Sequence, residues 1–273
     1  MTRILSTAAT EFRIALRNRW VAIALVLMAV FSLVLSLAGS APTGGLGVDR
    51  LSVTVASLTS LSVYLIPLLA LLMSFDAIAG ESERGTLPLL LAYPIAREEV
   101  LLGKLAAHLG ILALAVLLGH GLAAGVALWS DDTALAGLPA LWRLSWSSVL
   151  LGATFLGAGY ALSSLSRRPS GAAGLAIGLW LGLVVLYDLA LLSAIVADNG
   201  GWFTTTAFPL ALLANPADAF RLFNLTASGA TAAAAGVGGA ADAIPLWQSL
   251  ASVLLWPLAA LAIAAAAFRK VTP

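Results

Sequence analysis

The sequence predicts a single-domain, all-α integral membrane protein over residues 1–273, and three observations support this prediction. First, 61% of the residues are hydrophobic and the mean hydropathy is +1.01, whereas soluble domains are about half apolar. Second, only 10% of the residues are charged. Third, the apolar residues are gathered in runs of about 20, the length of helix that crosses about 30 Å of hydrocarbon. The chain contains no cysteine, which excludes disulfides, thiolate metal sites and cysteine nucleophiles.

Six apolar runs are long enough to form transmembrane helices. They cover residues 20–39, 53–75, 105–129, 144–165, 172–197 and 246–267. The first run follows Arg13, Arg17 and Arg19, as in a signal peptide, but it is longer than the roughly 7–15 apolar residues of such a segment. We therefore interpret it as a retained span. An even number of spans places both termini on the same side of the membrane.

Residues 1–19 are expected to form an interfacial helix. Arg13 and Arg17 lie on one face at helical spacing, and apolar residues lie on another. The apolar residues are Ile4, Leu5, Ala8, Phe12, Ala15 and Leu16. This pattern is typical of a helix that lies in the head-group layer.

The positive charges predict the orientation of the spans. Eleven Lys and Arg residues fall on one side: Arg3, Arg13, Arg17, Arg19, Arg84, Arg97, Lys104, Arg167, Arg168, Arg269 and Lys270. Three fall on the other side: Arg50, Arg143 and Arg221. Because cytoplasmic loops carry the excess of Lys and Arg, the first side and both termini are expected to be cytoplasmic.

Segment 76–104, which we call the platform, gathers five of the 13 acidic residues on this cytoplasmic side. Gly85 is expected to interrupt the helical structure, and Thr86 can cap the helix that follows. Pro94 ends this short helix, which is expected over residues 87–93. A new helix is expected from Arg97 onward.

The short helix of the platform would carry Leu87, Leu90 and Leu91 on one side. A helix, a break and a second helix at the membrane surface would suit insertion into the cleft of a soluble partner. An ordinary amphipathic loop, solvated at the interface, explains the composition equally well.

The outer side is expected to carry one long external loop, residues 198–245, before the last span. Asn215, Pro216 and Asp218 indicate the start of a helix, on which Phe220 and Phe223 would share a face. The loop also carries Trp202, Phe203 and Phe208, which is more apolar surface than a solvated loop requires. We expect part of it to dip into the outer leaflet and part to contact a periplasmic partner. Residues 227–243, rich in Ala and Gly, are expected to be a weakly ordered connector.

Glycines at close spacing mark two spans. Gly174, Gly178 and Gly182 lie four residues apart in the fifth span, and the fourth span contains Gly152, Gly157 and Gly159. Such glycines let another helix approach closely. Packing within one subunit explains them, and a dimer interface remains an alternative.

Two polar residues lie deep in the predicted spans. Asp188 and His120 are at similar depth and could pair, either as a structural hydrogen bond or as part of a translocation path. His108 and His120 point about 120° apart on their helix, so they cannot hold one ion together. The three methionines are scattered, and we expect neither a metal site nor a catalytic site.

The platform pattern Glu81-x-Glu83-x-Gly85-Thr86-Leu87, followed by Pro94-x-x-Arg97 and Gly103-Lys104, resembles type-two ABC transporter permeases. The resemblance covers essentially the whole chain, although Pro88 and Ala96 replace residues common in that family. It implies that the platform contains a coupling helix that docks on a separate ATPase. The docking residues would be Glu81, Glu83, Arg84, Gly85, Thr86, Leu87, Leu90, Leu91 and Arg97, with a second cytoplasmic contact at Arg167 and Arg168.

The chain lacks the G-x-x-x-x-G-K-[ST] loop, so we do not expect it to be an enzyme. ATP and magnesium would be bound by the partner ATPase, and this chain would bind no cofactor itself. The family resemblance implies two ATPase copies and a second copy of the permease in the lipid bilayer, with no nucleic acid.

Residues 75–81, 88–94 and 215–222 resemble, more narrowly, the permeases that serve maturation of nitrous oxide reductase in denitrification. This resemblance implies a bacterial inner membrane, a periplasmic partner, and supply of a sulfur species or support of copper delivery for a copper–sulfide cluster. The absence of clustered copper ligands favours the sulfur species. A permease for a drug, lipid or polysaccharide, or a membrane anchor that transports nothing, remains an alternative.

Overall fold

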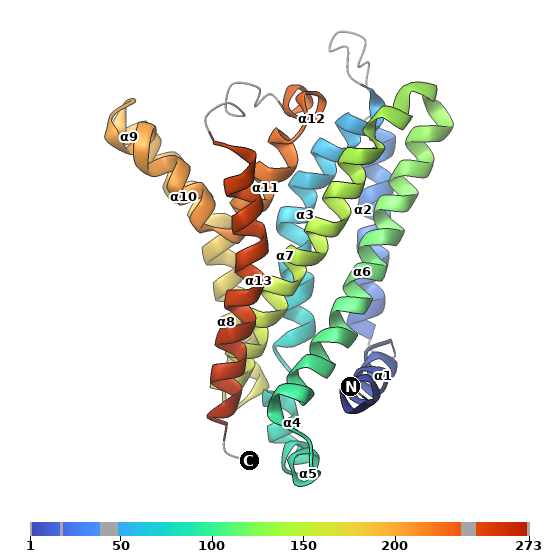
Figure 1. Cartoon of the computed structure of the whole chain (residues 1–273), viewed down its shortest axis with the longest axis vertical. Helices are drawn as coiled ribbons and strands as arrows, with labels where there is room; N and C mark the ends of the chain where they lie inside the picture. Colours follow the sequence, from blue (N-terminus) through green and yellow to red (C-terminus); the bar gives the residue numbers. More distant parts are fainter. Residues whose placement is uncertain (1, 17–18, 39–48, 236–243, 272–273) are drawn as a thin grey trace.

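A computed structural model describes residues 2–16, 19–38, 49–235 and 244–271, and every element in these residues is a helix. Figure 1 shows long helices that run side by side, with α4 and α5 at one end of the bundle and α9 projecting near the other. We call the first of these the platform end. The predicted all-α fold is confirmed.

Five helical segments are long and apolar enough to cross a membrane, and a sixth is added if α1 and α2, bent by 76°, are counted as one span. α1 packs against the foot of α6 (Figure 1). The bounds are α1 Thr2–Leu16, α2 Arg19–Ala38, α3 Arg50–Ser74, α6 Arg97–Ser130, α7 Leu138–Leu165, α8 Pro169–Trp180, α9 Tyr187–Asp198 and α13 Leu246–Arg269. The π-helix Leu181–Leu186 joins α8 to α9.

The predicted boundaries are close to the observed ones except at the start of α7, which begins six residues before the predicted span, and at the start of α6. The apolar run predicts a start near residue 105, whereas the helix begins at Arg97. The Glu99 carboxylate accepts a hydrogen bond from the backbone N–H of Ala96 at 3.0 Å, which fixes the first turn. The polar residues of this turn therefore extend the helix beyond its apolar part.

Helix α7 is the centre of the bundle because its glycines admit three neighbours. A Cβ added at Gly152 would lie 2.4 Å from Leu112 of α6, and one at Gly157 would lie 3.0 Å from the Ala260 backbone of α13. A Cβ at Gly159 would collide with Ser74 of α3. Close packing through these glycines confirms the expectation for the fourth span.

The second glycine pattern behaves differently. A Cβ at Gly174, Gly178 or Gly182 would meet nothing within 4 Å. Only 11% of the most apolar window of this span is buried. Packing inside one subunit is therefore wrong for these glycines, which lie on an open face of α8 and the π-helix after it.

The predicted long external loop is largely helical. It contains a π-helix Phe203–Ala207, α10 Phe208–Ala214, α11 Pro216–Thr226 and α12 Gly229–Ala234. The chain runs out along α9, returns along α10, and then re-enters the bundle as α11 beside α13 (Figure 1). The Asn215 side chain accepts a hydrogen bond from the Ala217 N–H at 2.9 Å, which confirms the predicted helix start.

The expectation that Phe220 and Phe223 add to the apolar surface of the loop that faces lipid or a partner is wrong. Phe220 and Phe223 are buried, and the Phe223 ring packs edge-to-face on Trp146 of α7 with the centroids 5.4 Å apart. They belong to the core and are covered against lipid and partners, whereas Trp202 is exposed. Part of the predicted connector forms α12, and residues 236–243 lie outside the described residues.

Candidate docking platform and buried polar clusters

The platform contains two short helices, α4 Ala79–Glu83 and α5 Thr86–Ala92, joined at Gly85. Gly85 has a positive φ of 69°, a conformation that favours glycine, and this reverses the chain between the helices. α5 matches the short helix predicted from the sequence. Thr86 makes no cap bond, and its hydroxyl donates instead to the Glu81 carbonyl at 3.2 Å.

The predicted apolar face of α5 (Leu87, Leu90 and Leu91) is turned toward the bundle and not toward a partner. Leu87 is fully buried, and Leu90 and Leu91 are half-buried against the core. Leu89 and Tyr93 are each 67% exposed instead. The three predicted leucines therefore anchor α5 to the bundle, and the two side chains that face outward were not among the predicted docking residues.

Backbone hydrogen bonds fix the base of the platform to α7. The N–H groups of Ile78 and Ala79 both donate to the Ser163 hydroxyl, at 3.0 and 2.9 Å. Ser163 lies in the last turn of α7 and is buried. Any displacement of α4 must therefore involve the end of the central helix.

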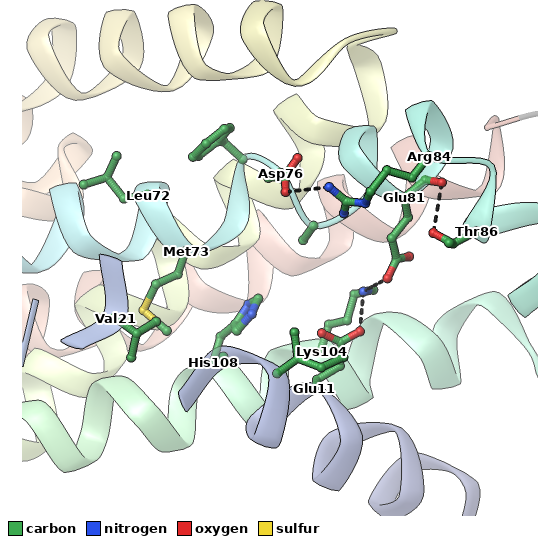
Figure 2. A pocket seen from close by; sticks show the side chains of 14 residues that line it. Glu11, Val21, Leu72, Met73, Asp76, Glu81, Arg84, Thr86, Lys104 and His108 are labelled. Atoms are coloured by element: carbon green, nitrogen blue, oxygen red, sulfur yellow. Dashed lines mark hydrogen bonds and ion pairs between the residues drawn. The ribbon is translucent and has the colours of Figure 1, made fainter. Parts of the chain in front are cut away.

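A buried lysine joins the platform to two other helices. The Lys104 ammonium is 2% exposed and donates to Glu11 of α1 at 2.5 Å and to Glu81 of α4 at 2.6 Å (Figure 2). Each carboxylate is less than one-fifth exposed. Glu81 was predicted to dock on a partner subunit, but its carboxylate instead binds Lys104 within the chain. Lys104 and Glu11, the other members of this cluster, were not predicted as site residues.

Other predicted docking residues divide between internal and exposed positions. Arg84 pairs with Asp76 at 3.3 Å and remains mostly exposed, and Glu83 is exposed. Arg167 and Arg168 are exposed between α7 and α8, and α8 contacts α4. These four charged side chains remain accessible near the platform end.

Arg97 binds backbone carbonyls at the C-terminal end of α13, the last span. Its guanidinium donates to the carbonyls of Phe268 at 2.8 Å and Val271 at 2.5 Å, and lies 5.7 Å from the centroid of the Phe268 ring. The last carbonyls of a helix have no partner within the helix, and a cation there also complements the helix dipole. Arg269 of α13 also donates to the Glu98 carboxylate of α6 at 2.8 Å, so the start of α6 and the end of α13 are held together. Arg97 thus makes its contacts within the chain, although it was predicted to dock on a partner.

The predicted pair of His120 and Asp188 is wrong. His120 Nδ1 lies 2.9 Å from the Ser145 hydroxyl, so its partner is on α7. Asp188 binds Arg221 of α11 at 3.0 Å, and Arg221 also binds Asp218 at 3.0 Å. The depth of Asp188 along its span could not predict this cluster. Its partner Arg221 lies on α11, which packs in the bundle but belongs to a segment that was predicted to be external.

Asp218 is the most enclosed member of this cluster, with 2% of its side chain exposed. Burial, together with the nearby Asp188 carboxylate, raises the pKa of Asp218 to about 7 against the lowering effect of Arg221. The cluster therefore holds a carboxyl group that changes its charge near neutral pH.

His108 makes a structural contact with α7. Its Nδ1 lies 2.7 Å from the buried Tyr160 hydroxyl, in a stacked arrangement of the two rings. Among the described residues, no group of three His, Cys, Asp or Glu side chains is placed to hold a metal ion.

Comparisons with known proteins agree over nearly the full chain. Residues 5–271 match the family model described as ABC-2 family transporter protein. The chain is 45% identical over 276 residues to the probable ABC transporter permease protein NosY of Pseudomonas aeruginosa, covering 99% of both chains. It is 42% identical over 277 residues to the protein of the same name from Stutzerimonas stutzeri, again covering 99% of both.

Proposed function

Because this chain belongs to the ABC-2 family of transporter proteins, we propose that its platform docks on a separate ATPase subunit and couples ATP hydrolysis to transport. The chain is a multi-pass ABC permease, and its proposed site is the inner membrane of a bacterium with both termini in the cytoplasm. ATP and magnesium would be bound by the ATPase, which supplies the chemical energy.

The observation that carries the docking proposal is the exposed apolar pair on α5. Leu89 and Tyr93 are each 67% exposed on a helix whose other face is anchored in the core. Fully burying a leucine side chain is worth about 1.5–3 kcal/mol, whereas an exposed ion pair gives at most about 1 kcal/mol. A soluble subunit that covered α5 would thus gain more from this pair than from the charges around it.

The internal contacts of the platform provide routes by which docking would act on the spans. Leu87 inserts α5 into the core, and the Ser163 bonds tie α4 to α7. Lys104 connects Glu81 to α6 and to α1 through Glu11. A movement imposed on α4 and α5 by the ATPase would therefore reach three long helices through direct contacts.

We further propose a complex of two permeases and two ATPases. ABC-type ATP sites form between two nucleotide-binding subunits, so two membrane subunits are needed to carry them. The open face around Gly174, Gly178 and Gly182 supports a helix contact between the permease copies. The projecting hairpin of α9 and α10, with its exposed Trp202, is the proposed contact for a periplasmic partner.

The proposed cargo is a sulfur species for the copper–sulfide cluster of nitrous oxide reductase. Support comes from the resemblance to permeases of that maturation pathway and from two relatives named as NosY permeases. The chain has no cysteine and only three methionines, so its sequence offers few of the soft ligands that copper passage requires.

Substitution of Leu89 by Asp tests the docking proposal. The lost burial, scaled to the 67% exposure of Leu89, is about 1–2 kcal/mol, so association should fall by at least about fivefold. The measurement is co-purification of the ATPase at matched permease levels. Glu83→Gln, an exposed change on neighbouring α4, is the comparison variant and should weaken binding less than Leu89→Asp does. Normal binding by Leu89→Asp would shift the docking surface to Arg167 and Arg168.

A further inference from the structure

A cavity of about 640 Å³ opens between α1, α3, α4 and α6 at the platform end. Its volume is within the roughly 300–1,000 Å³ range of small-molecule sites. We propose that this cavity binds phosphatidylethanolamine from the leaflet on the platform side, taking the head group and the first part of an acyl chain. This assignment goes beyond the proposed function and does not depend on an ATPase.

The two ends of the cavity differ in polarity in the same sense as a lipid molecule. Figure 2 shows Val21, Leu72 and Met73 at one end, and Asp76, Arg84 and Thr86 at the other. The apolar end lies along α3 toward the middle of the bundle, and the charged end lies at the platform. A lipid in the adjacent leaflet would therefore enter with its head group toward the platform and its chain toward the bilayer.

The interfacial helix provides the side wall of the cavity. Ile14 and Ala15 line it from α1, the helix whose amphipathic pattern places it in the head-group layer. α1 thus holds the cavity at the depth where lipid head groups meet acyl chains. A water-soluble ligand would use neither the apolar end nor this wall.

The charges favour a head group that carries both a phosphate and an ammonium. Three carboxylates (Glu11, Asp76 and Glu81) and two cations (Arg84 and Lys104) line the cavity, which gives a net charge of −1. Lys104 is committed to two carboxylates, whereas Arg84 is 58% exposed and makes one ion pair. The Arg84 guanidinium can therefore receive a phosphate with its remaining donors.

Glu81 supplies the preference for a primary ammonium. Its Oε2 atom is buried and has no hydrogen-bond partner among the described residues, although Oε1 binds Lys104. A buried acceptor without a donor is costly. An ethanolamine ammonium offers three N–H donors, whereas a choline group offers none. A phosphatidylglycerol head group brings a phosphate without a cation, so it would raise the net charge of the cavity from −1 to −2.

The binding test uses the full chain, purified in detergent and stripped of lipid. Native mass spectrometry would follow titration with phosphatidylethanolamine, phosphatidylcholine and phosphatidylglycerol of identical acyl chains, and with free phosphoethanolamine. We expect one tight phosphatidylethanolamine per chain and at least tenfold weaker binding of the other lipids. Equal binding of all three lipids would overturn the proposal, and equally tight binding of phosphoethanolamine would assign the site to a soluble ligand instead.

Variants locate the binding within the cavity. Met73→Trp fills the apolar end and should weaken phosphatidylethanolamine binding at least tenfold, and Arg84→Gln should weaken it severalfold. Leu118→Trp, on an exposed part of α6 away from the cavity, is the matched control and should change nothing.

Leu72→Trp provides a second filling variant if Met73→Trp elutes as aggregated protein. Wild-type lipid binding by a folded filling variant would refute the site. Failure of this proposal leaves ATPase co-purification unchanged, so the two proposals are tested separately.

Discussion

Replacing Lys104 by Met should destabilise the permease more than any single charge change on its surface. The Lys104 ammonium is 2% exposed, and Glu11 and Glu81 approach it to 2.5 and 2.6 Å. Met matches the length of the lysine stem, so little packing is lost. The two carboxylates, however, would face each other without a cation.

Removing one partner from a buried ion pair costs about 3–5 kcal/mol. The lower value is the better estimate here, because the carboxylates are 16% and 19% exposed and gain water through the cavity. On the scale of soluble domains, where 1 kcal/mol corresponds to about 2–4 °C, a loss of about 3 kcal/mol lowers the unfolding midpoint by about 6–12 °C.

Thermal unfolding of the purified chain in detergent measures this effect. Lys270→Met removes the other lysine of the chain, which is exposed, and should shift the midpoint by less than about 2 °C, as surface changes do. Combining Lys104→Met with Glu11→Gln and Glu81→Gln leaves a neutral cluster and should recover most of the loss. An unchanged midpoint for Lys104→Met, or a triple variant no more stable than the single one, refutes the reasoning.

Two further predictions concern the cluster of Asp188, Asp218 and Arg221, and the glycines of α7 and α8. Because burial raises the pKa of Asp218 from 3.8 to about 7, the folded chain keeps a proton that the unfolded chain loses between these values. Thermal stability should therefore fall as pH rises from about 4 to 7, and Asp218→Asn should flatten this slope; an identical slope in the variant contradicts the assignment. Gly157→Leu should lower the unfolding midpoint because α13 backbone atoms lie 3.0 Å from the added Cβ, whereas Gly178→Leu meets open space and should weaken only self-association, measured by light scattering. Unchanged self-association of Gly178→Leu would argue against this face as the contact between copies.

Local patterns were sufficient to predict the spans, the short platform helix and the start of α11. Asn215 followed by Pro216 predicts a helix start from the bonding capacity of these residues alone, and the observed cap bond agrees. The glycines of α7 likewise predict close packing, although their spacing does not name the neighbours. Each of these features depends on residues adjacent in sequence or on one helix.

Features that depend on distant residues were not predictable in this way. Lys104 meets Glu11 from 93 residues away, and Arg221 meets Asp188 from 33 residues away. The inward orientation of Leu87 depends on how the turn at Gly85 sets α5 against the bundle. Helical spacing places three leucines on one side of a helix, but only the tertiary contacts decide which side is buried.

The packing of α13 on α7 has a consequence for synthesis of the chain. Gly157 of α7 meets the backbone of α13 at Ala260, and 104 residues separate the end of α7 at Leu165 from the end of α13 at Arg269. At about 5–20 residues per second, a ribosome needs about 5–20 s to make this interval. During that time the face of α7 around Gly157 is open to lipid or to the membrane-insertion machinery. Premature termination before α13 would therefore leave a chain whose central helix has one uncovered face.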